Sequence, residues 1–351
     1  MQEPPQRAPD ISVVILGYNG MTWVDRCFRS IQAQTIFDQL EIIVSDNAST
    51  DGSEAVAEQW ISTWRNGQVI RNASNLGFCA GNNVGAAGAR GRYLFFVNND
   101  TWLEPDCLRI LLAEADRAGA AGATPLVMDY DTNDFQGLGG DGFDLFGLSA
   151  PSRRASETIA VFIGYGAAFM VRREVFAEVG GFDPELFMYV DEVDLSCRIW
   201  MAGHKIIGVP AARMHHRGAA SVNPEGRTVI VEQRTSDTKR FFTNRNNLLL
   251  WLKNGQHVLL ALALTNLLWL AAEALVALVL LRRWSHVRRA YLNALADCWR
   301  LRHHIFQQRR QIQQYRQRSD WWMLRFLRWT PSRWPEVKKL FTRGVPRVDS
   351  R

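Results

Sequence analysis

Short apolar runs and longer segments of helical periodicity alternate over the first two thirds of the chain. ISVVIL and YLFFV are rich in β-branched and aromatic residues and are typical of buried strands. Strands are expected at residues 11–16, 40–45, 68–71, 93–97, 121–127 and 205–210. Helices are expected at 21–34, from the low fifties to about Trp64, at 105–118 and from Asp191. This alternation predicts an α/β fold with a mainly parallel sheet.

Polar clusters follow three of these strands directly. They are Gly17–Asn19, Asp46–Asp51 and Asn98–Asp100. In open parallel sheets, ligands bind beyond the carboxyl ends of the strands. The pattern therefore predicts a binding site built from these three loops.

The remaining pattern divides the chain into regions. We expect a disordered N-terminus at 1–10, a catalytic α/β domain at 11–250 and a helical region at 251–351. Residues 128–158 are rich in Gly, Asp and Ser and are predicted to form a long loop or flap. Val258–Leu281 is a run of 24 residues whose strongly polar members are Thr265, Asn266 and Glu273.

Charge is distributed unevenly between these regions. Residues 282–351 contain 18 Lys and Arg but 4 Asp and Glu, although the whole chain has a net charge of only +6. The preceding part is therefore acidic, and the basic tail indicates an anionic partner, either nucleic acid or a lipid surface. The five cysteines form no CxxC pair, and the N-terminus has no apolar run. We expect a reducing, cytosolic setting and no secretory signal.

Two acidic clusters are candidates for chemistry. Asn98-Asn99-Asp100 could hold Mg²⁺ or Mn²⁺ on phosphate oxygens, although an ordinary turn would use the same residues. In Asp191-Glu192-Val193-Asp194, Asp191 could cap a helix and Asp194 could pair with Arg198. Glu192 has no such structural role, which makes it a candidate general base.

Two further positions have both a structural and a functional interpretation. His215 and His216 follow the strand at 205–210 and could bind a metal or a phosphate, or lie on the surface without a ligand. Asp46 could bind a base or a ribose, or form an Asx turn. No G-x-G-x-x-G sequence follows the first strand, which weakens a dinucleotide-binding interpretation.

Taken together, the motifs resemble the family 2 glycosyltransferases of GT-A fold, in particular the bacterial rhamnosyltransferase-like branch. The resemblance covers residues 11 to about 250. It rests on six segments in the family's order: SVVILGYNG (12–20), IIVSDNASTDGS (42–53), NLGFCAGNNVG (75–85), YLFFVNNDTWLEPD (93–106), residues 164–206 and HHRGAAS (215–221).

The resemblance implies a role for each matching residue. Nucleotide-sugar contacts are implied for Tyr18, Asn19, Asp46, Asn75, Asn98 and Asn99. Asp100 and His216 are the implied metal ligands, with Asn98 where the family's DxD motif usually begins with Asp. The acidic pair is usually Glu-Asp, so Glu192 takes the place of the base, with Asp191 beside it. The implied acceptor-side residues are Gly181, Phe182, Asp183 and Asp194.

The activity implied by the resemblance is inverting, metal-dependent sugar transfer. The donor is a nucleotide sugar, with dTDP-rhamnose as the best guess, and Mg²⁺ or Mn²⁺ is the cofactor. The acceptor is a hydroxyl of a glycan or of a lipid-linked sugar in cell-surface polysaccharide synthesis, and nucleic acid is not a partner. A homo-oligomer is left open. Two alternatives are a nucleic-acid-binding protein that uses the basic tail and a catalytically silent nucleotide-sugar-binding module.

Val258–Leu281 is long enough to span a bilayer. With a cytosolic catalytic domain, a span would place the basic tail outside, against the positive-inside tendency, and would bury Glu273 in lipid. We therefore expect helices that lie in the interface, with the basic tail on anionic lipids at the cytoplasmic face of the cell membrane. The alternative is a buried hairpin that packs on the catalytic domain or on a second subunit.

Overall fold

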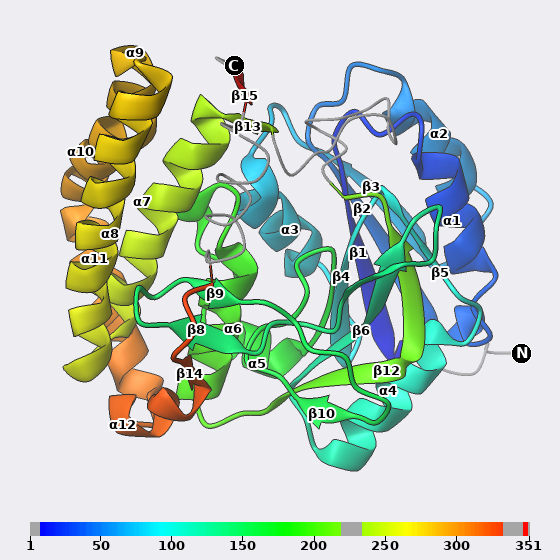
Figure 1. Cartoon of the computed structure of the whole chain (residues 1–351). Coiled ribbons are helices and arrows are strands. Elements are labelled where there is room, and N and C mark those ends of the chain that lie inside the picture. The colour runs from blue at the N-terminus through cyan, green and yellow to red at the C-terminus, as the bar shows by residue number, and fades with distance from the viewer. Residues whose placement is uncertain (1–7, 219–233, 333–346, 350–351) are drawn as a thin grey trace, which may run out of the picture.

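A single large sheet organises the N-terminal part of the molecule (Figure 1). The computed structural model describes residues 8–218, 234–332 and 347–349. From edge to edge, the sheet contains β10 (Ile159–Ala160), β12 (Ile206–His216), β6 (Gly122–Asp129), β11 (Ala168–Arg172), β4 (Tyr93–Asn98), β1 (Ile11–Gly17), β2 (Leu40–Asp46) and β3 (Gly67–Arg71). β11 is antiparallel to both its neighbours, and the other long strands are parallel. The mainly parallel α/β sheet is thus confirmed.

Side chains alternate between the two faces of this sheet, and each face is covered by helices. In β4, Phe95 and Val97 contact one core while Leu94 and Phe96 contact the other. The first core includes α1 (Val24–Gln32), α2 (Ser53–Ile61) and α4 (Cys107–Ala118). The second includes α3 (Gly77–Ala87), α5 (Arg173–Glu178) and α6 (Asp191–Met201). Burial on both faces explains why these strands are continuous apolar runs.

Some local predictions need correction. The predicted loop at 128–158 contains β7 (Phe135–Gly137), β8 (Gly142–Asp144) and β9 (Ser149–Ala150), because its backbone pairs with neighbouring strands. The strand expected at 205–210 continues past a bulge to His216, where it pairs with β5 (Thr101–Leu103). Of the predicted disordered N-terminus, residues 1–7 lie outside the described residues, and the Asp10 amide donates to the Gln39 carbonyl.

The C-terminal helices pack as a bundle against the sheet domain (Figure 1). They are α7 (Asp237–Asn254), α8 (Val258–Leu281), α9 (Trp284–Val287), a π-helical turn (Arg288–Leu292), α10 (Asn293–Arg300), α11 (Arg302–Tyr315) and α12 (Asp320–Met323). Leu259 and Met323 belong to the same hydrophobic core as Phe96 of the sheet. The domain boundary expected at residue 250 falls inside α7. Residues on both sides of this boundary belong to one core.

One carboxylate fixes the start of α8. Asp320 accepts hydrogen bonds from the backbone amides of Gln256, His257 and Leu259, at 2.7 to 3.2 Å. It also pairs with Arg316, and both side chains are buried. The first amides of a helix have no partner within the helix, and Asp320 supplies one from a distant part of the chain.

We predict that Asp320→Ala lowers the free energy of unfolding by about 3–5 kcal/mol, because it leaves Arg316 buried without its partner. Urea denaturation measures the change. The matched control is Asp25→Ala, which removes an exposed pair with Arg29 and should cost less than about 1 kcal/mol. Equal effects of the two substitutions would contradict this role of Asp320.

Candidate active site

The carboxyl ends of three adjacent strands bring the predicted loops together. Gly17 at the end of β1 is in register with Asp46 of β2, and Leu16 is in register with Asn98 of β4. A Cβ on Gly17 would lie 3.2 Å from the Asp46 Oδ1 atom, so the first loop passes directly over this carboxylate. The parallel register therefore places the three polar clusters at one edge of the sheet.

Hydrogen bonds lock the first two loops to each other. The Asn19 amide donates to Ser49 Oγ, and the Thr50 amide donates to Asn19 Oδ1 at 2.8 Å. The Met21 amide donates to Asp51 Oδ2 at 2.8 Å. Asn19 adopts a positive φ of 48°, a conformation that asparagine tolerates better than most residues. These contacts give the donor side of the site a fixed backbone.

The side chains assigned to the donor differ in accessibility. Tyr18 is 48% exposed, whereas Asp46 is 2% exposed and accepts two hydrogen bonds from Ser49. The Asp46 carboxylate thus has a local structural partner, although the bond goes to the amide three residues on and not two, so it is not the predicted Asx turn. Asn75 Oδ1 accepts from the Gly77 amide at the start of α3 and from Asn47. Their contacts with a nucleotide sugar stay predictions.

The structure brings together the two predicted metal ligands. His216 Nε2 lies 3.5 Å from Asp100 Oδ1, across the β12–β5 pairing. Burial lowers the pKa of His216, although the Asp100 charge opposes this shift, so the imidazole is neutral and able to bind a metal. His215 points elsewhere: its ring stacks on Trp102 at 3.6 Å, and Nε2 lies 3.4 Å from Glu104.

The residues at this position fit a divalent ion that is shared with a diphosphate. Two buried nitrogens at the site, His216 Nδ1 and Asn99 Nδ2, have no hydrogen-bond partner. Within the ranges that the structure describes, no group of three His, Cys, Asp or Glu side chains is arranged to hold a metal alone. Mg²⁺ on phosphates typically needs only one or two protein carboxylates. The last residues of the segment HHRGAAS, 219–221, lie outside the described residues.

The acidic pair opens α6. Val190 precedes the helix as its N-cap and Asp191 is its first residue, so the prediction that Asp191 caps the helix is wrong. Asp191 is buried, whereas Glu192 keeps part of its surface exposed. Burial raises the pKa of both carboxyl groups above their ordinary values, and the charge of Glu192 raises that of Asp191 further. Glu192 is thus the more accessible member of the pair and a stronger base than an ordinary glutamate.

Tyr165 and Gly166 lie between Glu192 and Asp100, and no role was predicted for either of them from the sequence. A Cβ on Gly166 would lie 3.4 Å from the Glu192 carboxyl carbon. Burial raises the pKa of Tyr165 to about 12, with smaller contributions from the charges of Glu192 and Asp100. Tyr165 therefore lies within electrostatic reach of both the base and the metal ligand, and its hydroxyl stays protonated at neutral pH. The only sequence signal was the glycine on each side of the tyrosine.

The acceptor-side assignments need partial correction. Phe182 is buried among aromatic rings that include Phe96 and Phe176. Asp183 and Asp194 are 5% and 0% exposed, and both pair with Lys253 of α7. The structure thus gives these three side chains structural partners, and their contacts with an acceptor stay predictions. The predicted pairing of Asp194 with Arg198 is confirmed at 2.8 Å, and Gly181, with φ 68°, stays an acceptor-side prediction.

Comparison with known proteins agrees with this geometry. Residues 12–180 match the profile of glycosyl transferase family 2. The chain contains a family 2 glycosyltransferase domain. The profile includes the strand ends that carry Asp46 and Asp100 but ends before Glu192, which lies further along the chain.

Two bacterial proteins are among the relatives of the domain. EpsH of Bacillus subtilis, named as a glycosyltransferase, is 34% identical over 109 residues, which is 31% of this chain and 31% of EpsH. The match thus spans about a third of EpsH. The N-acetylglucosaminyl-diphospho-decaprenol L-rhamnosyltransferase of Mycobacterium tuberculosis is 28% identical over 240 residues, covering 60% of this chain and 77% of that protein.

A solved structure supports the fold assignment. The chain is similar to a mannosyltransferase from Pyrobaculum calidifontis that was solved with GDP-Man and Mn²⁺. The TM-score is 0.53 at 16% sequence identity, covering 84% of this chain and 89% of the other. At this identity, the likeness is one of fold, and the fold is of the GT-A type.

We predict that Asp100→Asn and His216→Gln each weaken Mn²⁺ binding by at least about tenfold, since each removes a proposed ligand. Electron paramagnetic resonance of Mn²⁺ in the presence of UDP measures binding without turnover. The matched control is Glu104→Gln, which alters the carboxylate beside His215 and should leave Mn²⁺ affinity unchanged. Unchanged affinity in the Asp100 and His216 variants would contradict the assignment of the ligands.

Proposed function

We propose that this protein transfers a sugar from a nucleotide-sugar donor to an acceptor hydroxyl by single displacement, with inversion at the anomeric carbon. The observation that carries the proposal is the placement of Glu192. Glu192 is partly exposed, its carboxyl group has a raised pKa, and it lies beside Gly166 and within electrostatic reach of Tyr165, which also feels the charge of Asp100. The family 2 domain and its GT-A fold support the same reaction class.

Glu192 accepts the proton of the attacking hydroxyl in this mechanism. A hydroxyl is a poor nucleophile until its proton is removed, and a base whose pKa is raised toward neutrality removes it more effectively. Asp191 is more deeply buried than Glu192, and burial together with the charges of Glu192 and Asp194 raises its pKa, so Asp191 is the harder of the two to ionise. The pair therefore presents one accessible base.

Asp100 and His216 are the residues that would hold a divalent ion on the donor diphosphate. Bound there, Mg²⁺ or Mn²⁺ would stabilise the negative charge that develops on the leaving nucleotide. The locked backbone of residues 17–21 and 46–53 gives the nucleotide a rigid surface. Donor and acceptor chemistry are thus assigned to different parts of the chain.

The substrate assignment is more specific than the reaction class. We propose a rhamnosyl donor and a glycan or lipid-linked acceptor, because the Mycobacterium tuberculosis relative is an L-rhamnosyltransferase named for a diphospho-decaprenol acceptor. Incubation with dTDP-rhamnose, UDP-sugars and GDP-sugars, read as released nucleotide, tests the donor. Release from dTDP-rhamnose alone is expected, and preferential release from another donor would overturn this assignment.

We predict that Glu192→Gln lowers kcat by roughly 10²–10⁴-fold, because glutamine keeps the shape of the side chain but accepts no proton. Donor affinity, measured by calorimetry, should be unchanged. The wild-type rate should fall as pH drops through the raised pKa of Glu192, above the ordinary value of 4.5, because protonation removes the base. This acidic limb should be absent from the residual activity of the variant.

Asp191→Asn is the matched control, since it alters the buried neighbour with the same type of change. A crippled Asp191→Asn protein together with a fully active Glu192→Gln protein would reverse the assignment within the pair. Full activity of both would contradict base catalysis by this motif, whereas no turnover by the wild type with any donor would favour the silent-module alternative.

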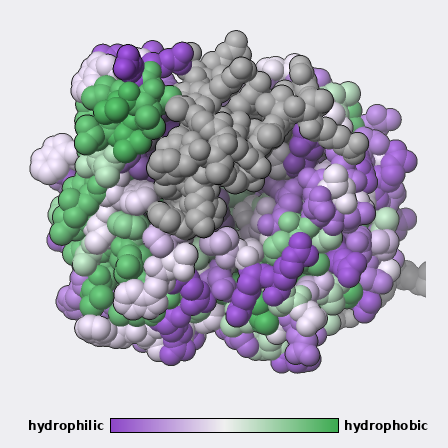
Figure 2. Space-filling view, viewed as in Figure 1, coloured by the Kyte–Doolittle hydropathy of each residue, from purple (hydrophilic) through white to green (hydrophobic). Residues whose placement is uncertain are grey.

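We further propose that the protein works on the cytoplasmic face of a membrane, held there by α8. Among the described residues, α8 is the one helix long and apolar enough to cross a membrane. Only 11% of the most apolar stretch of this helix is buried inside the protein. One side packs on α7, while the other exposes large apolar side chains: Leu264, Leu267, Leu268, Leu275, Val276, Val279 and Leu280. Figure 2 shows apolar residues gathered along the side of the molecule where α8 lies in Figure 1.

Basic and aromatic residues adjoin this apolar surface. Arg282, Trp284 and Arg288 follow α8 directly and are exposed. Tryptophan favours the membrane interface, and arginine is attracted to anionic headgroups. The opposite side of α8 packs in the shared core, as the buried-hairpin alternative predicts. The exposed apolar side does not fit that alternative.

We predict that Leu268→Glu combined with Leu275→Glu reduces partitioning onto phosphatidylglycerol-containing vesicles by about 100-fold or more, because each exposed leucine contributes roughly 1.5 kcal/mol or more when buried in lipid. Vesicle flotation measures the change. Met21→Glu, at an exposed apolar residue of the donor loop, is the control and should float like the wild type. Wild-type flotation of the α8 variant would contradict the membrane assignment.

A further inference from the structure

Residues 185–190 form the segment that leads into the catalytic pair, Asp191 and Glu192, and this segment has an uncommon backbone conformation. Phe187, Tyr189 and Val190 have φ values of 61°, 67° and 65°. L-residues rarely adopt positive φ, and for a β-branched residue such as Val190 it is a clear outlier. Such conformations persist where the surroundings hold them in place. Val190 immediately precedes Asp191 and Glu192, so what holds this segment also sets the start of α6.

One side chain of α7 holds most of the segment. Asn246 Nδ2 lies within hydrogen-bond distance of the carbonyl oxygens of Leu186, Met188 and Tyr189, at 2.9, 2.9 and 2.8 Å. Asn246 Oδ1 accepts from Arg245 Nε at 2.9 Å, and Asn246 is fully buried. The Asn246 nitrogen thus binds the segment, and the Asn246 oxygen binds Arg245, which fixes the orientation of the amide.

Arg245 extends this contact by one residue along the segment. Its Nη2 atom donates to the Glu185 carbonyl at 2.6 Å and to the Leu186 carbonyl at 3.1 Å. Its Nη1 atom pairs with Asp297 of α10 at 2.8 Å. The guanidinium is therefore fixed from the far side by the helical bundle.

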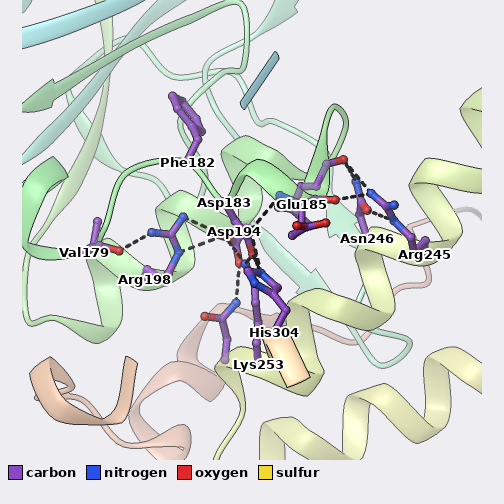
Figure 3. A network of polar contacts seen from close by, with 12 residues as sticks. Val179, Phe182, Asp183, Glu185, Asp194, Arg198, Arg245, Asn246, Lys253 and His304 are labelled. Carbon is purple, nitrogen blue, oxygen red and sulfur yellow. Dashed lines mark hydrogen bonds and ion pairs between the residues drawn. The ribbon is translucent and has the colours of Figure 1, made fainter. Parts of the chain in front are cut away.

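A second side chain of α7, Lys253, contacts a residue on each side of the same segment (Figure 3). Lys253 Nζ pairs with Asp183, which precedes the segment, and lies 3.0 Å from Asp194 Oδ2 in the first turn of α6. Asn254 Nδ2 donates to Asp194 Oδ1 at 2.8 Å, and His304 of α11 lies 2.9 Å from Asp183 Oδ1. All these groups are wholly or largely buried.

Asn246 and Lys253 are seven residues apart, two helical turns, and so lie on the same face of α7. We propose that this face of α7 is the positioning element for the general base, with Asn246 as the principal positioning residue and Lys253 as the second. The inference rests on the proposed role of Glu192 and adds what fixes that carboxylate. Asn246 and Lys253 are both buried, so each acts on Glu192 through the segment that it holds.

The donor loops provide an internal reference. The hydrogen bonds that hold residues 17–21 and 46–53 run within and between these two loops. A displaced α6 turn should therefore slow transfer without changing nucleotide affinity. A loss of fold would instead reduce the number of nucleotide-binding sites and leave the rate per remaining site unchanged.

The test is Asn246→Ala, with kcat normalised to the concentration of nucleotide-binding sites from UDP titration. We expect kcat per site to fall about 10- to 100-fold, the size of effect that follows from misplacing a catalytic group by about 1 Å. The UDP dissociation constant should stay within twofold of the wild type. Unchanged kcat per site would overturn the inference.

Asn247→Ala is the matched control. Asn247 is also buried, but its Nδ2 atom donates to the Thr243 carbonyl within α7 and not to the segment. It should keep the wild-type kcat per site, and an equal loss in both variants would also overturn the inference. If Asn246→Ala yields no folded protein, Asn246→Ser keeps one donor and is judged by the same criteria.

Glu192→Gln in the same assay separates this inference from the proposed function. Loss of activity in Glu192→Gln with full activity in Asn246→Ala would refute the positioning role alone. Full activity in both would refute the base and, with it, the inference.

Discussion

Neutralisation of two buried carboxylates is the interaction on which the arrangement of this protein depends. Asp183 and Asp194 come from the sheet domain, and Lys253, which pairs with both, comes from the C-terminal bundle. Arg198, Asn254 and His304 are further partners. These partners hold the pKa of both carboxyl groups below its ordinary value, so both stay ionised at neutral pH. Removing one partner from such a network typically costs about 3–5 kcal/mol.

This network also separates the roles of carboxylates within one helical turn. Asp194 has cations beside it, and its pKa is lowered. For Asp191 and Glu192 burial is the dominant influence, and their pKa values are raised. The first turn of α6 thus contains an ionised structural anchor and, two residues before it, a carboxylate suited to accept a proton. Environment, and not residue type, distinguishes them.

The sequence predicted the sheet and the clustering of its polar strand ends, because buried parallel strands are short apolar runs and their carboxyl ends meet at one edge. It predicted the Asp194–Arg198 pair for a similarly local reason. The approach of His216 to Asp100 needed the β12–β5 pairing, which joins residues far apart in the chain. Asn246 and Lys253 were missed because nothing in a helical sequence indicates which distant carbonyls or carboxylates its polar residues will meet.

The same limit applied to Asp183 and to α8. Motif position alone placed Asp183 on the acceptor side, yet its carboxylate faces Lys253 and His304. The apolar composition of α8 was plain, but only the packing shows which of its sides is covered. Burial is a property of the folded chain, and it decides whether a polar or apolar residue is structural or available for contact.

The central claim is direct displacement at the anomeric carbon with Glu192 as base, and the stereochemistry of the product tests it most directly. Proton NMR of the early product, with a donor of defined anomeric configuration, reads the configuration of the new glycosidic bond. A single displacement predicts a product whose configuration is opposite to that of the donor. A product that retains the donor's configuration would contradict the account, because retention requires a mechanism other than one displacement by the acceptor hydroxyl.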